Sequence, residues 1–137
     1  MNKLIIREAT LEDVEAIYKL NKTELGYDYS IESTEENMHR LIASDTDKIY
    51  VALLDNKVVG YIHSNDYNLI YAPHMKNIMG IAVSSQYKRM GIGHALLMEV
   101  EKWAMQTDAK GVRLVSGETR ANAHLFYQNC SYTEDKK

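Results

Sequence analysis

Two basic residues and two glycines occur together in the run Lys88-Arg89-Met90-Gly91-Ile92-Gly93, immediately before a pattern typical of a long helix. The first turn of a helix has backbone N–H groups without intrahelical partners and the positive end of the helix dipole, so it attracts phosphate. Glycines let a bulky diphosphate approach the backbone, and Lys88 and Arg89 add positive charge. The run predicts a phosphate-binding turn. On these residues alone, the alternative is an ordinary helix start with loop glycines and solvated basic side chains.

Two common phosphate motifs do not match this run. A P-loop requires Lys and then Ser or Thr after its last glycine, whereas His94 and Ala95 follow Gly93. A dinucleotide fingerprint requires a third glycine three residues after Gly93, and Leu96 stands there. A third ligand for such a turn is coenzyme A, whose pyrophosphate would bind the helix start and whose pantetheine arm would follow the preceding strand.

The elements that must position this turn follow from hydrophobic periodicity and capping residues. A short strand at Leu4 and Ile6 precedes a helix that Thr10 and Asp13 would cap, and that would continue to about residue 18. Ser33 and Glu36 predict a second cap, before a helix over about residues 34–44. Strands at residues 48–54 and 58–64, joined by a turn at residues 55–57, predict a β-hairpin.

The second half of the chain predicts the remaining elements. Residues 65–76 predict a loop, followed by a strand at 77–83, a helix at 91–106, a strand at 112–116 and a helix at 120–129. The expected order is therefore β-α-α-β-β-β-α-β-α. A chain of 137 residues with 45% hydrophobic content, without repeats or linkers, predicts one domain over residues 1–137.

The composition restricts the classes of function. With 16 Lys and Arg against 19 Asp and Glu, the net charge of −3 predicts no general affinity for nucleic acid or for an anionic membrane. Apolar runs such as residues 50–54 are too short for a membrane span, and we expect a cytoplasmic protein. Cys130 is the single cysteine, which excludes an internal disulfide. The histidine spacing fits no compact metal motif, so we predict no metal.

Three segments resemble the Gcn5-related N-acetyltransferase (GNAT) family. The run IAVSSQYKRMGIGHALL is similar to its acetyl-CoA motif. That motif consists of Gln or Arg, any two residues, Gly, any one residue, and then Gly or Ala. In this chain Lys88 stands at the Gln/Arg position. IIREATLEDVEAI is similar to its first strand and helix, and RANAHLFYQNCSY to its segment Asn-x-x-Ala-x-x-Phe-Tyr. SGETR followed by AHLFY resembles the branch that contains aminoalkylphosphonate acetyltransferases.

The resemblance, over about residues 3–132, implies an α/β (α+β) fold. Its central sheet would be mixed and mostly antiparallel, with a splay between the two central strands and helices on both faces. The family continues beyond the position of Tyr132 into one more strand, which would be short or missing here. Two alternatives follow: the chain is short here, or another chain fills that edge of the sheet. Since an uncovered strand edge pairs readily with a neighbour, a homodimer is one way to cover it.

The resemblance also implies the chemistry, with acetyl-CoA as co-substrate and the primary amine of a small molecule as acceptor. Backbone N–H groups of the strand before the turn would stabilise negative charge on the thioester oxygen. Tyr127 is the family's usual general acid, which would protonate the leaving thiolate. The residues expected to bind the cofactor are Ile81, Ala82, Val83, Lys88, Arg89, Met90, Gly91, Ile92, Gly93, His94 and Arg120.

The base that would deprotonate the amine stays open. Many relatives carry a glutamate on the strand before the motif, where this chain has Gly80. Glu118, His63 and His74 are the alternatives. The acceptor would be recognised by acidic and aromatic residues of the first interhelix loop and of residues 65–76, namely Glu24, Tyr27, Asp28, Tyr29, Asp66, Tyr67 and Tyr71.

The missing strand glutamate and the short C-terminal end motivate a second hypothesis. In it, the chain is a module that binds an acyl-CoA or a protein partner with little turnover.

Overall fold

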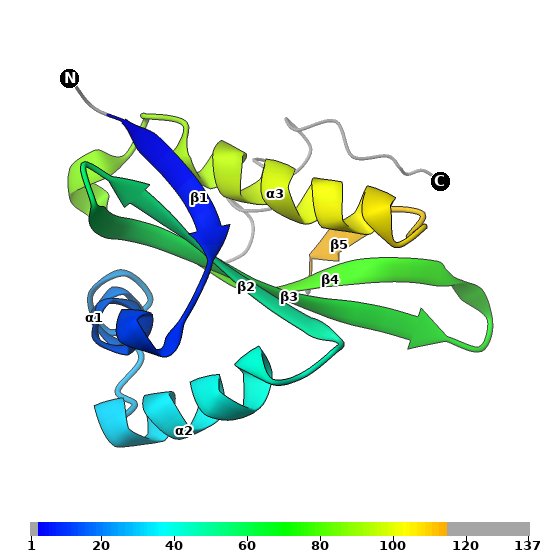
Figure 1. Cartoon of the computed structure of the whole chain (residues 1–137), viewed down its shortest axis with the longest axis horizontal. Coiled ribbons are helices and arrows are strands. Elements are labelled where there is room, and N and C mark those ends of the chain that lie inside the picture. The colour runs from blue at the N-terminus through cyan, green and yellow to red at the C-terminus, as the bar shows by residue number, and fades with distance from the viewer. Residues whose placement is uncertain (1–2, 115–137) are drawn as a thin grey trace.

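The computed structural model describes residues 3–114, in which five strands form one sheet with helices packed on both of its faces (Figure 1). This confirms the predicted α/β fold and the predicted order of elements as far as the fifth strand. The predicted helix at residues 120–129 lies outside the described residues, as do Glu118, Arg120, Tyr127 and Cys130. The elements are β1 (Leu4–Glu8), α1 (Val14–Glu24), α2 (Ile31–Ile42), β2 (Asp47–Leu54), β3 (Lys57–Leu69), β4 (Ala72–Val83), α3 (Ile92–Gln106) and β5 (Val112–Leu114), with single 3-10 turns at Leu11–Asp13 and Ser85–Tyr87.

The strands follow one another in the sheet in the order β1-β2-β3-β4-β5. The first three pairs are antiparallel and the β4–β5 pair is parallel, so the sheet is mixed and mostly antiparallel, as the resemblance implies. The described β4–β5 pairing joins residues 76–78 to residues 112–114. The splay expected beyond this point stays a prediction, because the partner residues lie outside the described part of the chain.

Both faces of the sheet are covered by helices. Helices α1 and α2 lie on one face and α3 on the other (Figure 1). On the first face, Ile17 and Met38 pack with Val51 in one buried cluster. On the second face, Leu96 and Val100 of α3 pack with Ile62 of β3. The central strands are therefore apolar on both sides, which explains why they appear in the sequence as short continuous hydrophobic runs.

The cap predicted at Thr10 and Asp13 is confirmed. The Thr10 N–H donates to Oδ2 of Asp13 at 2.8 Å, and the Thr10 hydroxyl accepts from the Glu12 N–H at 3.3 Å. The cap opens a 3-10 turn that continues into α1. Asp13 is buried and also accepts two hydrogen bonds from Arg7, at 2.8 and 3.0 Å. Burial alone would raise the pKa of Asp13, but the bonds from Arg7 and Thr10 outweigh it and lower that pKa below its usual value.

The cap predicted for the second helix was wrong by three residues. Ser30, with extended backbone, accepts the Ser33 N–H on its hydroxyl at 3.1 Å, and α2 begins at Ile31. Ser33 therefore lies inside the first turn. Both serines precede helical sequence, and the extended conformation of Ser30 decides between them.

The loop predicted at residues 65–76 was also wrong, because β3 and β4 continue through it and form one long hairpin (Figure 1). The polar side chains of this segment suggested a loop, but they pair with one another across the hairpin. Asp66 accepts from the Lys76 ammonium and lies 3.1 Å from Nε2 of His74. Lys76 is only 1% exposed, and its Nζ lies 3.6 Å from the centroid of the Trp103 ring. Mutual pairing thus allows charged residues to occupy buried strand positions.

The predicted β2–β3 hairpin is confirmed, with a shorter turn than expected. Asp55 and Asn56 both have left-handed backbone conformations, with φ of 53° and 69°, and β3 already begins at Lys57. Two consecutive left-handed residues are typical of the type I′ turn that matches the twist of a hairpin. None of the described helices is long and apolar enough to cross a membrane.

Candidate active site

A cavity of about 380 Å³ lies at the N-terminus of α3, where sequence analysis placed the phosphate-binding turn. The structure brings the expected cofactor residues together around it, with two exceptions. Met90 is 45% exposed and does not line the cavity, and Arg120 lies outside the described residues. Tyr87 was missed, although it stands directly before Lys88 in the same run. The lining residues are Ile81, Ala82, Val83, Tyr87, Lys88, Arg89, Gly91, Ile92, Gly93 and His94.

The backbone of this turn has two left-handed residues, Arg89 with φ of 69° and Gly91 with φ of 78°. Gly91 is the N-cap of α3, and its carbonyl accepts the Ala95 N–H at 3.0 Å, which closes the first helical turn. A Cβ atom on Gly91 would meet no other atom within 4 Å, so the backbone conformation is what requires glycine here. Left-handed residues followed by a helix start form a concave arrangement of N–H groups that suits an anion.

Contacts on both sides fix the position of the turn. Before it, the Ser84 N–H donates to the Val59 carbonyl at 2.8 Å, and the Ser85 N–H donates to Oε2 of Glu24 at 3.0 Å. After it, Ile92 is buried in the core cluster of α3. A Cβ atom on Gly60 would lie 3.3 Å from the Ile92 side chain and 3.0 Å from the Ala82 carbonyl oxygen, so glycine at position 60 lets α3 approach the sheet.

The residues present fit the diphosphate of coenzyme A. The helix start offers N–H groups and a positive dipole, Lys88 and Arg89 add two positive charges, and the cavity continues along β4 past Val83 to Ile81. A pantetheine arm needs such an extended wall with backbone polar groups. Among residues 3–114, no three His, Cys, Asp or Glu side chains form a group that could hold a metal ion.

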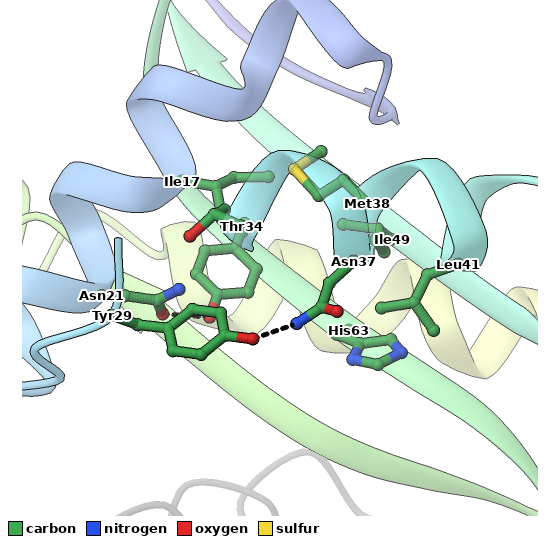
Figure 2. Close-up of a pocket in the computed structure, with 10 residues that line it drawn as sticks. Ile17, Asn21, Tyr29, Thr34, Asn37, Met38, Leu41, Ile49 and His63 are labelled. Carbon is green, nitrogen blue, oxygen red and sulfur yellow. Dashed lines mark hydrogen bonds between the residues drawn. The ribbon is translucent and has the colours of Figure 1, made fainter. Parts of the chain in front are cut away.

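A second cavity, of about 140 Å³, lies on the other face of the sheet between α1, α2 and strands β2 and β3 (Figure 2). Asn37 Nδ2 donates to the Tyr29 hydroxyl at 2.9 Å, and the Tyr61 hydroxyl donates to Oδ1 of Asn21. Burial is the main reason why the pKa of Tyr61 is raised to about 12, so this phenol stays neutral at pH 7. The lining residues are Ile17, Asn21, Tyr29, Thr34, Asn37, Met38, Leu41, Ile49, Tyr61 and His63.

Most of the residues expected to recognise the acceptor do not meet at this cavity. Tyr29 lines it, whereas Glu24 binds the backbone of Ser85 and Asp66 binds Lys76. Most of the lining, including Asn21, Asn37 and Tyr61, was not predicted from the sequence, because it comes from four separate elements. The remaining expected residues are Tyr67, whose ring packs on the guanidinium of Arg113, Tyr71, which is exposed at the hairpin turn, and Tyr27 and Asp28, which are exposed in the interhelix loop.

The structure separates the alternatives for the base. His63 lines the second cavity, and its Nε2 lies 2.8 Å from Oδ2 of Asp47. His74 pairs with Asp66 on the long hairpin and lines neither cavity. Glu118 lies outside the described residues.

The two cavities are lined by neighbouring strands, the first by β4 and the second by β3 and β2. Ala82 lines the first cavity and pairs in register with Tyr61, which lines the second. The β4 backbone that lines the first cavity therefore lies one strand spacing, about 5 Å, from the β3 backbone that lines the second.

Comparisons with known proteins agree with this arrangement. The sequence pattern of the acetyltransferase (GNAT) family matches residues 14–132. An N-alpha-acetyltransferase of Sulfurisphaera tokodaii is 32% identical over 139 residues, which cover 96% of this chain and 81% of the relative. A streptothricin acetyltransferase of Escherichia coli is 26% identical over 137 residues, covering 96% and 71%. The aminoglycoside N-acetyltransferase AAC(6')-Iy, solved in complex with CoA, has the same fold with a TM-score of 0.85 at 13% identity, covering 100% of this chain and 92% of the other. The chain therefore belongs to the acetyltransferase (GNAT) family.

Proposed function

We propose that this protein transfers the acetyl group of acetyl-CoA directly to the primary amine of a small molecule. The observation that carries the proposal is the pairing of Ala82 with Tyr61, which places the strand that lines a cavity suited to coenzyme A beside a strand that lines a second, smaller cavity. An enzyme that joins two substrates needs two adjacent sites that meet at the reacting atoms.

Each part of the first cavity has a role in this proposal. The turn with Lys88, Arg89 and Gly91 binds the pyrophosphate, and the backbone of Ile81, Ala82 and Val83 binds the pantetheine arm. An N–H of this strand stabilises the negative charge that develops on the carbonyl oxygen during attack. When bound, acetyl-CoA supplies the acetyl group as an activated thioester. Arg120 is proposed to contact the cofactor, on the strength of the motif match alone.

Tyr127 is proposed as the general acid because it occupies the tyrosine position of the AHLFY segment that matches the family. As the C–N bond forms and the C–S bond breaks, its phenol donates a proton to the leaving sulfur. The amine must lose a proton before attack, since an alkylammonium ion has no lone pair. A base, for which Glu118 and His63 are the remaining candidates, is needed because only about 0.04% of such an amine is neutral at pH 7.

The size of the second cavity bears on the acceptor. About 140 Å³ holds about five water-sized groups, since one water occupies about 30 Å³ of liquid. It therefore suits the amino-bearing end of a molecule. The relative named streptothricin acetyltransferase supports a small-molecule acceptor. The SGETR and AHLFY segments extend the proposal to aminoalkylphosphonates.

A peptide N-terminus is the second candidate acceptor. The relative that is 32% identical over most of both chains is named an N-alpha-acetyltransferase, and a relative in Saccharolobus solfataricus with the same name is 30% identical. The first residue of a peptide also fits a cavity of this size.

Release of thiol from acetyl-CoA across a panel of acceptors tests the proposal. The panel contains alkylamines, polyamines, streptothricin, aminoglycosides, aminophosphonates and peptides with unblocked N-termini, each with its N-acetylated form as the control. Release with small amines supports the proposal, and release with peptides alone replaces it by the second candidate. No release above the blank, despite calorimetric binding of acetyl-CoA, would leave an acyl-CoA-binding module with little turnover. Light scattering tests the proposed homodimer.

A further inference from the structure

We propose that His63, positioned by Asp47, is the catalytic base that takes a proton from the amine in the second cavity. This inference rests on the proposed function, because a base of this kind is needed only if an amine is acetylated. It assigns the role to a residue of β3, whereas the carboxylate expected for the family would stand at position 80 on β4.

The hydrogen bonds of Asp47 determine which nitrogen of His63 can accept a proton. Oδ1 of Asp47 accepts from the Ser44 hydroxyl at 3.1 Å and from the Thr46 hydroxyl at 3.2 Å, and Oδ2 lies 2.8 Å from Nε2 of His63. An ionised carboxylate only accepts hydrogen bonds, so Nε2 carries the proton and donates it to Asp47. In a neutral ring, Nδ1 is then the unprotonated nitrogen.

The surroundings of the pair suit a base. The His63 side chain is 19% exposed and the Asp47 side chain 11%, so the pair is largely shielded while the ring still reaches the cavity. Figure 2 shows the His63 ring beside Asn37, at the edge of the cavity below Leu41. Once His63 is protonated, the carboxylate stabilises the imidazolium, as the aspartate of a hydrolase triad does.

Sheet register places His63 next to the strand that would bind the thioester. His63 pairs directly with Gly80 of β4, so the two residues face the same side of the sheet. A Cβ atom on Gly80 would meet only the Tyr61 hydroxyl, at 3.8 Å, which leaves the β4 backbone uncovered beside the ring. Gly80 is two residues, about 7 Å along the strand, from Ala82 of the cofactor cavity.

The other side chains that line the second cavity include no Asp, Glu, Lys, Arg or further His. Besides His63, two titratable side chains line the cavity, and both are tyrosines, Tyr29 and Tyr61. On β2, Asp47 contacts the His63 ring, and Ile49 is the residue that pairs with His63 in register. The side chains that α1 and α2 contribute do not titrate, namely Ile17, Asn21, Thr34, Asn37, Met38 and Leu41.

The proposed step balances in atoms and charge. The ammonium form of the acceptor gives one proton to Nδ1 of His63, directly or through one water, and the neutral amine attacks the thioester carbon. The C–N bond forms and the C–S bond breaks. The nitrogen loses a second proton on forming the amide, and the thiolate takes up one proton. His63 returns its proton to solvent, so each turnover releases one proton in total.

The test compares His63→Gln with His74→Gln on the best amine of the panel. Both histidines pair with an aspartate, but His74 lines neither cavity. We expect His63→Gln to lower kcat by about 10²- to 10³-fold at pH 7, in the range of general base catalysis, with unchanged acetyl-CoA affinity. Its remaining rate should rise about tenfold per pH unit with the fraction of neutral amine. His74→Gln should keep the wild-type kcat.

Two further variants separate a base from a structural residue. Asp47→Asn should lower kcat about tenfold with little change in the KM for the amine, because the imidazolium that forms during proton transfer loses its counter-charge. Gly80→Glu, added to His63→Gln, returns a carboxylate to the same face and should recover at least tenfold in kcat. Position 80 has room for a side chain, as its Cβ contact of 3.8 Å shows.

The outcomes distinguish failure of this inference from failure of the proposed function. If the wild type turns over an amine and His63→Gln stays within twofold of it, the base assignment alone is wrong. If the wild type acetylates no amine, both proposals fail. Nitrogen NMR of the His63 ring is measured on the wild type, so its result does not depend on whether a variant folds. In the neutral ring it should show the proton on Nε2, and a proton on Nδ1 of the neutral ring would overturn the assignment.

Discussion

The Ser85 N–H donates a hydrogen bond to Oε2 of Glu24, with 3.0 Å between the two atoms, although 61 positions separate them in the chain. The bond joins the C-terminal end of α1 to the short turn that precedes Lys88. From the sequence, the acidic side chain of Glu24 was expected to attract the amine. The structure instead makes Glu24 a residue that positions the backbone leading into the first cavity.

Glu24→Ala is expected to raise the Kd for acetyl-CoA by about fivefold, since an exposed hydrogen bond contributes about 1 kcal/mol. Glu24→Gln is the matched control, because an amide oxygen can still accept the Ser85 N–H while the charge is removed. Calorimetry measures both. Equal affinity for Glu24→Ala and the wild type would show that the turn holds its position without this bond.

The parts of the fold that depend on residues close together in the sequence were predictable. The cap of Thr10 and Asp13 and the Asp55-Asn56 turn each close within a few residues, so their residue types are enough to identify them. The long hairpin was not predictable in this way. Asp66 and Lys76 look like loop residues until β3 and β4 pair, and only then does each neutralise the other.

The same distinction applies to the two cavities. The first cavity, which we propose binds the cofactor, was largely predictable because its lining falls in two short runs, residues 81–83 and 87–94. The second cavity gathers Asn21, Tyr29, Asn37 and His63 from separate elements, and their proximity depends on how α1 and α2 pack on the sheet. No short sequence pattern predicts how these helices pack on the sheet.

Gly91→Ala is expected to lower the free energy of unfolding by about 1–2 kcal/mol, because alanine is strained at a φ of 78°. It should also weaken acetyl-CoA binding at least tenfold, since relief of the strain displaces the backbone that binds the pyrophosphate. Gly26→Ala is the matched control. Gly26 has a φ of 74° and equally open surroundings but lies in the α1–α2 loop. It should cost similar stability and leave acetyl-CoA affinity unchanged; a parallel loss of affinity would mean that strain alone explains the effect.

Tyr127→Phe is expected to lower kcat by about 10²-fold with little change in the Kd for acetyl-CoA, because the phenol acts only when the thiolate leaves. Tyr18→Phe on α1 provides a control for the loss of a hydroxyl elsewhere. Steady-state kinetics with saturating acetyl-CoA measure both variants. An unchanged kcat would assign protonation of the thiolate to solvent and remove the proposed role of Tyr127.

Asp13→Asn is expected to lower the free energy of unfolding at pH 7 by about 1–2 kcal/mol, since it replaces a buried carboxylate that accepts from Arg7 and Thr10. The pKa of Asp13 is lower in the folded protein than its usual value of 3.8, so below that value the unfolded chain binds more protons. The stabilisation is therefore complete above about pH 4 and is lost as the pH falls through the folded pKa. Urea unfolding from pH 7 to pH 2 should show the wild type approaching Asp13→Asn at the acid end.

The remaining acid dependence of the variant comes partly from Asp66, whose pKa is also lowered because its bonds to Lys76 and His74 outweigh the effect of burial. Asp45→Asn, at an exposed position, should follow the wild type at every pH. A constant difference between wild type and Asp13→Asn over the whole range would contradict a lowered pKa at Asp13.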